Sequence, residues 1–165
     1  MRHYINTSKG RLYYKPVTLY LGIKQINREV AFQNLKVVAK VLEQHHLKVR
    51  PAFGSMLGIV RDHDFIEWDE DIDLCLLDAE EEEFKSALWD LKDNGFNLIR
   101  YERLGLYSIM RNGEYIDFYI SDKISPDVYF EGGAFTLSKH LENDQEWDFK
   151  GIKVYIPKDY DKYLT

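Results

Sequence analysis

Two neighbouring segments decide how this chain folds: Phe53-Gly54-Ser55-Met56-Leu57-Gly58 and Trp68-Asp69-Glu70-Asp71-Ile72-Asp73-Leu74. The first is a turn of small residues, and such a turn can bring backbone N–H groups close to a phosphate. The second is a carboxylate cluster at the start of an apolar run, and carboxylates bind hard cations such as Mg²⁺. Together the two segments indicate metal-assisted chemistry on a phosphorylated substrate.

The acidic segment predicts a strand over residues 71–77. Side chains alternate between the faces of a strand, so Asp71 and Asp73 project to one side and Leu74 to the other. Asp69 joins the acidic side if the strand begins early enough. Two carboxylates ~4 Å apart repel by about 4 kcal/mol at an effective dielectric of 20, so a shared pocket requires a cation or a raised pKa. A solvated acidic loop is the alternative, but the apolar run that follows favours a central strand and a site.

A third carboxylate occurs inside another strand-like run, Tyr115-Ile116-Asp117-Phe118-Tyr119-Ile120. A charge in such a run is costly to bury unless it is paired or bound to metal. An edge strand with Asp117 facing water is the alternative. A strand beside the first would let Asp117 supply a third ligand or a base. We therefore expect Mg²⁺ or Mn²⁺ at Asp71, Asp73 and Asp117, with Asp69 as a further candidate ligand.

Composition restricts the remaining possibilities. The chain has 165 residues, which suits one domain, and a net charge of −6, which gives no general reason to bind nucleic acid. The single cysteine, Cys75, excludes an intrachain disulfide and a cysteine-rich zinc site. No apolar segment is long enough to span a bilayer, and nothing at the start has the pattern of a signal peptide. We expect a cytoplasmic protein with membrane contact that is at most peripheral, and the oligomeric state stays open.

Periodicity and turn residues predict an α/β (α+β) fold with a mixed or antiparallel sheet flanked by helices. Residues 1–18 are predicted to be an irregular arm, and residues 19–165 a single domain. The helix that follows residue 77 should begin with Asp78 as its N-cap and Glu81 three residues later, and Asn94-Gly95 should end it. The remaining expected elements are helices over 20–45 and 56–60, strands over 47–53, 97–102, 107–111, 115–121 and 152–156, turns at Asn112-Gly113 and Gly132-Gly133, and a terminal turn or helix from residue 157.

The expected strand, turn and helix start at residues 47–60 would aim the N–H groups of Ser55 and Met56 outward, toward a ligand.

Two stretches carry a resemblance to the LicD family, which includes bacterial phosphocholine transferases and fukutin-related proteins: Phe53-Gly54-Ser55-Met56-Leu57-Gly58-Ile59-Val60-Arg61 and Phe65-Ile66-Glu67-Trp68-Asp69-Glu70-Asp71-Ile72-Asp73. The family pattern is roughly Gly-Thr-Leu-Leu-Gly-x-x-Arg, a short spacer and Ile-Pro-Trp-Asp-Asp-Asp-Ile-Asp, and the spacing agrees. The segment 149–164 resembles the family's closing segment. The departures are Ser55 for Thr, Glu67 for Pro and Glu70 for Asp.

The resemblance implies a nucleotidyltransferase-like fold. It implies transfer of a substituted phosphate, such as phosphocholine or a polyol phosphate, from a CDP-activated donor to a glycan hydroxyl. It also implies that Gly54 and Ser55 lie against the donor phosphates, that Asp71 and Asp73 bind metal, and that Asp117 is the third acid. The expected partners are therefore a nucleotide-activated donor and a glycan acceptor.

Two further residues of the motif are candidates for binding the donor. Arg61 matches the arginine of the family pattern and would pair with a phosphate. Trp68 would stack on a base or a choline group, with a packing role as the alternative.

Two other functions remain open at this point. The same fold and acids would serve a nucleotidyltransferase that moves NMP from an NTP to a small molecule or a protein. A non-catalytic nucleotide-binding module is the third hypothesis, and the intact set of three acids argues against it.

Overall fold

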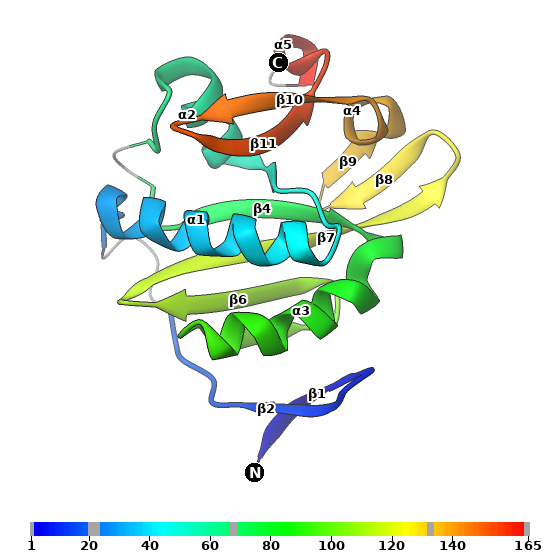
Figure 1. The fold of residues 1–165 in the computed structure, drawn as a ribbon. Coiled ribbons are helices and arrows are strands. Elements are labelled where there is room, and N and C mark those ends of the chain that lie inside the picture. The colour runs from blue at the N-terminus through cyan, green and yellow to red at the C-terminus, as the bar shows by residue number, and fades with distance from the viewer. Residues whose placement is uncertain (1, 20–23, 67–68, 132–133, 164–165) are drawn as a thin grey trace.

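A mixed sheet forms the centre of the molecule (Figure 1). The computed structural model describes residues 2–19, 24–66, 69–131 and 134–163. The strands lie in the order β3 (Arg50–Pro51), β4 (Ile72–Leu77), β7 (Glu114–Ser125), β6 (Leu106–Arg111) and β5 (Asn97–Glu102). β4 runs parallel to β7, and the other neighbours are antiparallel. The predicted mixed sheet flanked by helices is confirmed.

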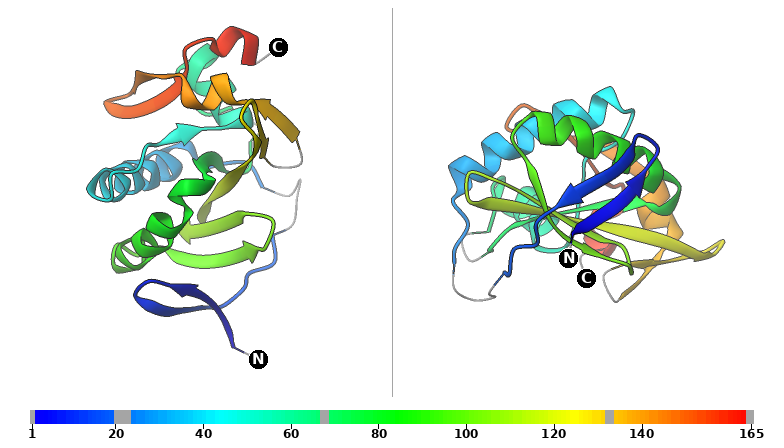
Figure 2. Two further views of the ribbon diagram at one scale, coloured as in Figure 1. Left: turned by 90° about the vertical axis from the view of Figure 1, so that its right-hand side faces the viewer. Right: turned by 90° about the horizontal axis from the view of Figure 1, so that it is seen from below.

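Two long helices, α1 (Arg28–Gln44) and α3 (Glu81–Asp93), cover one face of this sheet side by side (Figure 2). The core beneath α3 is aromatic. The Phe84 ring lies 4.5 Å from the Phe118 ring and 5.3 Å from the Tyr107 ring, measured between centroids. All three side chains are buried, and burial of each such side chain stabilises the fold by about 1.5–3 kcal/mol.

The helix boundaries differ from those predicted. α1 begins at Arg28, because the side chain of Asn27 caps it by accepting a hydrogen bond from the N–H of Val30 at 3.1 Å. The prediction of a start near residue 20 is wrong, and residues 20–23 lie outside the described part of the chain. α3 follows a 3₁₀ turn, η1 (Asp78–Glu80), and ends before Gly95, whose φ of +92° suits glycine.

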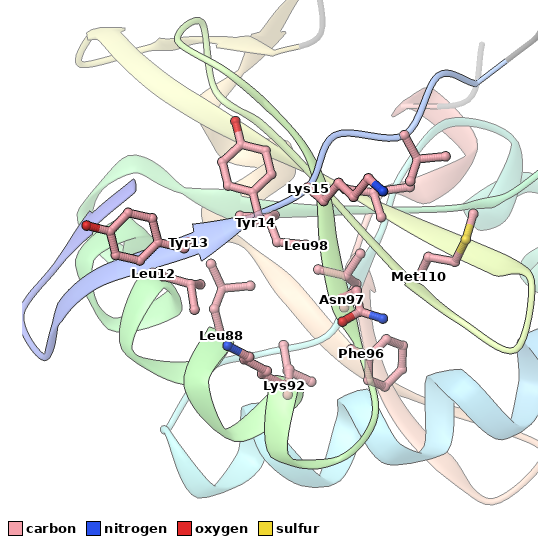
Figure 3. Close-up of a pocket in the computed structure, with 14 residues that line it drawn as sticks. Leu12, Tyr13, Tyr14, Lys15, Leu88, Lys92, Phe96, Asn97, Leu98 and Met110 are labelled. Atoms are coloured by element: carbon pink, nitrogen blue, oxygen red, sulfur yellow. The ribbon is translucent and has the colours of Figure 1, made fainter. Parts of the chain in front are cut away.

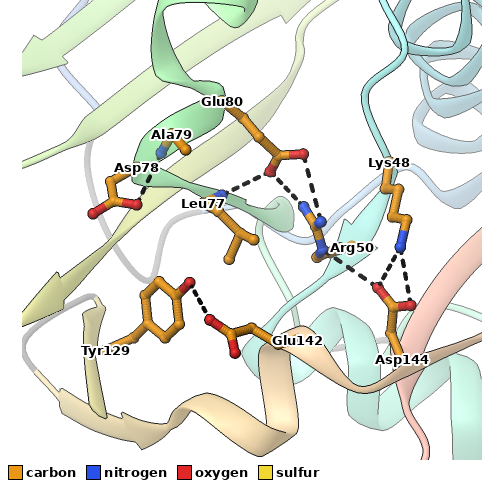
Figure 4. Close-up of polar contacts among 9 residues, drawn as sticks. All are labelled: Lys48, Arg50, Leu77, Asp78, Ala79, Glu80, Tyr129, Glu142 and Asp144. Carbon is orange, nitrogen blue, oxygen red and sulfur yellow. Dashed lines mark hydrogen bonds and ion pairs between the residues drawn. The ribbon is translucent and has the colours of Figure 1, made fainter. Parts of the chain in front are cut away.

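The predicted capping box is also displaced by one residue. Glu80, rather than Glu81, accepts the N–H of the preceding Leu77, at 2.9 Å (Figure 4).

The N-terminal residues form a hairpin and not the irregular arm that was predicted. β1 (His3–Thr7) pairs with β2 (Gly10–Tyr14) at the foot of the molecule (Figure 1). Ile5 lies opposite Leu12 in this pair, and both side chains are buried. Trp89 of α3 donates its indole N–H to the Thr7 hydroxyl at 2.9 Å. The hairpin is therefore part of the folded domain.

The β6–β7 hairpin was predicted correctly. Asn112 and Gly113 have φ values of +56° and +80°, the conformation that a two-residue hairpin turn requires. β7 continues beyond the predicted end to Ser125, where it pairs with β8 (Val128–Glu131), and β8 pairs with β9 (Ala134–Leu137). The predicted turn at residues 132–133 lies outside the described residues.

The C-terminal part adds a second layer at the β3 edge of the sheet. It consists of α4 (Ser138–Glu142), the antiparallel pair β10 (Asp144–Phe149) and β11 (Ile152–Pro157), and α5 (Tyr160–Tyr163). Arg50 on β3 is buried and pairs with Glu80 at 2.6 Å and with Asp144 at 3.7 Å (Figure 4). Lys48 binds the same Asp144 carboxylate. This ion-pair cluster ties β3 to η1 and to β10.

In the described residues, no helix combines the length and the apolar character that crossing a membrane requires.

Candidate metal centre and active site

Strand register brings the three predicted acids together. β4 and β7 are parallel neighbours, and Asp73 lies directly beside Asp117 in their register. Asp71 precedes β4 and stands two residues before Asp73, so it shares the same side of the strand. Each of the three offers a carboxylate oxygen, and these oxygens lie within 4.8 Å of one another. The side chain of Asp117 is only 5% exposed.

This crowding makes full ionisation of the cluster unfavourable. Burial is the largest cause that raises the pKa of Asp71, followed by a hydrogen bond and repulsion from Asp117 and by repulsion from Asp73. Burial also raises the pKa of Asp73, with Asp117 and Asp69 adding repulsion. A hard divalent cation would relieve this repulsion, and oxygen ligands are what such a cation prefers. The donor set therefore fits Mg²⁺ or Mn²⁺.

The start of α2 (Phe53–Asp62) holds the Asp73 backbone from both sides. The Ser55 hydroxyl accepts the Asp73 N–H at 2.8 Å, and the Ala52 N–H donates to the Asp73 carbonyl at 2.9 Å. Ser55 is buried, so this hydroxyl serves the strand. The predicted outward aim of the Ser55 and Met56 N–H groups is wrong, because both donate to the Ala52 carbonyl, at 3.1 and 3.3 Å.

Gly54, the first glycine of the motif, lies close to the carboxylate of Asp69. A Cβ at Gly54 would lie 3.0 Å from Oδ2 of Asp69, so a larger residue would require this carboxylate to move by a few tenths of an ångström. Asp69 thus lies against the N-terminal turn of α2, and burial there raises the pKa of its carboxyl. It is not one of the three acids whose ligand atoms cluster, although it adds repulsion at Asp73. Its role as a further ligand stays a prediction.

Two other residues, Arg61 and Trp68, were also predicted to bind the donor. Arg61 is exposed in the last turn of α2, seven residues after Gly54, which is roughly 10 Å along a helix axis. Trp68 lies outside the described residues.

The structure adds two residues that the sequence reasoning missed, Arg100 and Ser108. Arg100 of β5 lies beside Ser108 of β6, and Ser108 lies beside Asp117 of β7. Nη2 of Arg100 donates to both Asp117 oxygens at 3.1 Å, and Nε donates to the Ser108 hydroxyl at 2.9 Å. That hydroxyl donates to Asp117 at 2.5 Å. With Asp73, these residues form one polar row across four strands.

A signal for Arg100 exists in the sequence only once the strand register is known. Residues 97–102 contain an arginine in a strand-like run, and the same is true of many surface strands. The pairing of β5 with β6 is regular from the turn to Arg100, and its irregularity lies beyond, between Leu98 and Arg100. The arginine can therefore be placed opposite Ser108 only if these two strands are taken to form a hairpin.

Aromatic residues border the acids. Tyr119 is two residues from Asp117 on β7, and its pKa is raised by burial and by the charges of Asp73 and Asp117. The Phe53 ring packs edge-on against Tyr119, with 5.1 Å between centroids. Phe53 also lines an open groove of about 490 Å³ together with Leu57, Phe135 and Leu137. Phe53 has a φ of +50°, which is costly for a side chain of this size.

A second cavity lies away from the acids. It has a volume of about 440 Å³ and is enclosed by the N-terminal hairpin, α3 and β5 (Figure 3). Leu12, Leu88, Phe96 and Leu98 contribute to its apolar lining, and none of its described lining residues is a carboxylate. The candidate metal site is therefore separate from this cavity.

The fold is that of a nucleotidyltransferase. Over 80% of this chain and 83% of the other, the structure is similar to a lincosamide antibiotic adenylyltransferase, LnuA, with lincomycin bound, with a TM-score of 0.56 and 12% sequence identity. It is also similar to ANT(2″)-Ia in complex with adenylyl-2″-tobramycin, with a TM-score of 0.51 and 14% identity over 81% of this chain and 76% of that one. At these identities the likeness concerns the fold alone.

The chain belongs to the LicD/FKTN/FKRP family, nucleotidyltransferase domain, whose pattern matches residues 50–160, more than half of its length. Among curated proteins, an uncharacterized protein of Rickettsia typhi (strain ATCC VR-144 / Wilmington) is 24% identical over 136 residues, which cover 78% of this chain and 42% of that protein. The chain thus spans less than half the length of this relative. Membership of the family supports a transferase of the nucleotidyl or phosphoryl kind.

Proposed function

We propose that this protein transfers a substituted phosphate, such as phosphocholine or a polyol phosphate, from a CDP-activated donor to the hydroxyl of a glycan. The observation that carries the proposal is the cluster of Asp71, Asp73 and Asp117, whose ligand atoms lie within 4.8 Å of one another. Family membership supplies the expectation of a phosphorylated donor.

The three acids would hold Mg²⁺ or Mn²⁺, which would neutralise charge on the donor phosphates. In the reaction, the acceptor oxygen forms a bond to phosphorus, and the bond from that phosphorus to the leaving CMP breaks. The leaving oxygen keeps the electron pair, and the proton of the acceptor hydroxyl passes to a carboxylate of the cluster. Ser55 and Ala52 keep Asp73 in place during this transfer, because they fix its backbone.

Product analysis tests the proposal. The protein would be incubated with CDP-choline, CDP-glycerol or CDP-ribitol, a glycan acceptor and Mg²⁺, and released CMP would be measured. We expect CMP from at least one donor, and loss of this release in Asp71→Asn and Asp73→Asn. Asp93→Asn is the matched control, because Asp93 is an exposed carboxylate at the end of α3. Full activity of folded Asp71→Asn and Asp73→Asn would refute the proposal.

A second candidate, transfer of NMP from an NTP, is favoured by the fold that this chain shares with two antibiotic-modifying enzymes, one described as an adenylyltransferase and one bound to an adenylyl-aminoglycoside. The same assay separates the two functions. Pyrophosphate released from CTP or ATP supports this candidate, whereas CMP released from a CDP-conjugate supports the first.

A further inference from the structure

Arg100 occupies an unusual place for an arginine, inside a cluster of acids. Its guanidinium reaches from β5 across Ser108 to Asp117, and the contacts use Nε and Nη2. Nη1 makes no hydrogen bond or ion pair with the residues that the structure describes. The Arg100 side chain is 30% exposed, whereas that of Asp117 is 5% exposed. One edge of the guanidinium is thus anchored and the other is accessible.

We propose that Arg100 is an anion-binding residue of this site and binds a phosphate of the donor. A guanidinium offers five N–H donors in a fixed plane, which suits phosphate oxygens. Two of its nitrogens are already oriented by Asp117 and Ser108, so little side-chain entropy remains to be lost on binding. This inference rests on the proposed function, because the anion in question belongs to the donor.

Charge makes Arg100 better placed for this role than Arg61. The acids of the cluster would repel a phosphate, and Arg100 is the cation that contacts one of them directly, at 3.1 Å from Asp117. Arg61 is exposed in the last turn of α2, remote from the first turn that touches Asp69 and Asp73. Arg103, which is exposed in the turn between β5 and β6, is the matched control arginine.

A purely structural role is the competing explanation. Arg100 could serve only to hold Asp117 in position for the metal. The two roles predict opposite effects of removing the guanidinium. A residue that only positions Asp117 supports metal binding, so its loss weakens binding of the metal alone. A phosphate-binding residue repels the metal, so its loss leaves metal binding unchanged or stronger and weakens binding of the anion.

Calorimetric titration separates these roles. Wild type, Arg100→Gln, Arg100→Lys and Arg103→Gln would each be titrated with Mn²⁺ alone, and with CDP and inorganic pyrophosphate in the presence of Mn²⁺, at constant ionic strength. We expect Arg100→Gln to bind both anions about tenfold or more weakly, the loss of a charge-assisted pair, with Mn²⁺ affinity equal to or above that of wild type. Arg103→Gln should match wild type throughout.

Two results would overturn the inference. One is anion binding by Arg100→Gln within about twofold of wild type; the other is a loss of Mn²⁺ affinity as large as the loss of anion affinity. If Arg100→Gln does not fold, Arg100→Lys decides. It keeps the charge without the planar fork, so weaker anion binding with unchanged Mn²⁺ binding supports the inference, and a loss of Mn²⁺ affinity as large as any loss of anion affinity refutes it. If wild type binds pyrophosphate but not CDP, the proposed CDP donor fails while the role of Arg100 is still tested.

Discussion

The cluster of Asp71, Asp73 and Asp117 is unfavourable to the metal-free fold. Asp71 and Asp73 are half-buried beside the buried Asp117, and burial and the charges of neighbouring carboxylates raise their pKa values. Such groups are tolerated when they bind a ligand that removes the repulsion. The site is therefore expected to cost stability in the absence of metal and to regain it when metal binds.

The first prediction concerns Asp71→Asn. Burial and neighbouring carboxylates raise the pKa of Asp71 to about 10 in the folded, metal-free protein, against about 3.9 in the unfolded chain. Between these values the folded state holds the proton more tightly, so the free energy of unfolding should fall as pH rises from about 4 to about 10. Asp71→Asn should flatten this decline and be more stable at pH 8 by on the order of 1–3 kcal/mol.

Urea unfolding in a metal chelator at a series of pH values measures this effect. Asp93→Asn, at an exposed position, serves as the control. A metal-free variant that is less stable than wild type at pH 8 would contradict the prediction.

The second prediction concerns Ser55→Ala. This change leaves the Asp73 N–H without the hydroxyl that accepts it at 2.8 Å. A buried donor without a partner costs about 1–3 kcal/mol, so the variant should unfold at lower denaturant and bind Mn²⁺ more weakly. Ser55→Thr keeps the hydroxyl and is the comparison. Equal stability of Ser55→Ala and wild type would contradict the role given to this hydroxyl.

At the scale of elements, a histidine links the two helices that cover the sheet. His45, at the end of α1, contacts Glu83 at 2.9 Å and Asp90 at 2.5 Å, both on α3. Burial lowers its pKa, but the hydrogen bonds and charges of Asp90 and Glu83 outweigh burial, so the pKa is raised. The bridge is therefore strongest when His45 is protonated.

The third prediction concerns His45→Gln and follows from the raised pKa of His45. A raised folded pKa means that the stabilisation is fully present below the unfolded value of about 6.5 and is lost as pH rises through the folded value. His45→Gln should therefore destabilise the protein at pH 5.5 by on the order of 1 kcal/mol, and by less at pH 9. Thermal unfolding at both pH values tests this, with the exposed His46→Gln as the control. A larger effect at pH 9 would contradict it.

The elements that were predicted well are those whose signals are local. The β6–β7 hairpin follows from Asn112-Gly113, and the end of α3 from Asn94-Gly95, because these residues suit the backbone conformations required. β10 and the β1–β2 hairpin were missed because their strands contain few aliphatic residues: Ile5 in β1, Leu12 in β2 and none in β10. Their pairing is fixed by tertiary contacts, which no short window of sequence reveals.

The residues of the candidate site can be divided in the same way, into those that local sequence signals predict and those whose placement depends on tertiary contacts. Asp71 and Asp73 are two residues apart, and this spacing predicted that they share one side of their strand. Asp117 was predicted to join them because a charge buried in an apolar strand is costly unless it is paired or bound to metal. Arg100 was missed, since its proximity to Asp117 depends on two strand pairings, that of β5 with β6 and that of β6 with β7.

At the scale of the whole molecule, the N-terminal hairpin completes the core below α3 and β5. Leu12 on β2 is 2% exposed and lines the cavity shown in Figure 3 together with Leu88 and Leu98. Tyr13, its neighbour, is 39% exposed. The hairpin should therefore contribute to global stability although it is remote from the acids.

The fourth prediction tests that contribution. Leu12→Ala should lower the free energy of unfolding by about 2–4 kcal/mol, because it removes buried methyl groups and leaves a cavity. Tyr13→Ala should cost about 1 kcal/mol or less, as expected for a partly exposed side chain. Chemical denaturation of both variants gives the comparison. Equal small effects would show that the hairpin is not part of the cooperative fold.

The most direct test of the site is a calorimetric titration of the chelator-treated protein with Mn²⁺, for wild type, Asp73→Asn and Asp93→Asn. We expect wild type and Asp93→Asn to bind one equivalent of Mn²⁺, and Asp73→Asn to lose at least about tenfold in affinity. A subsequent titration with CDP-choline or CTP should show binding that depends on the metal. Unchanged Mn²⁺ binding by folded Asp73→Asn would contradict the assignment of Asp71, Asp73 and Asp117 as the metal centre.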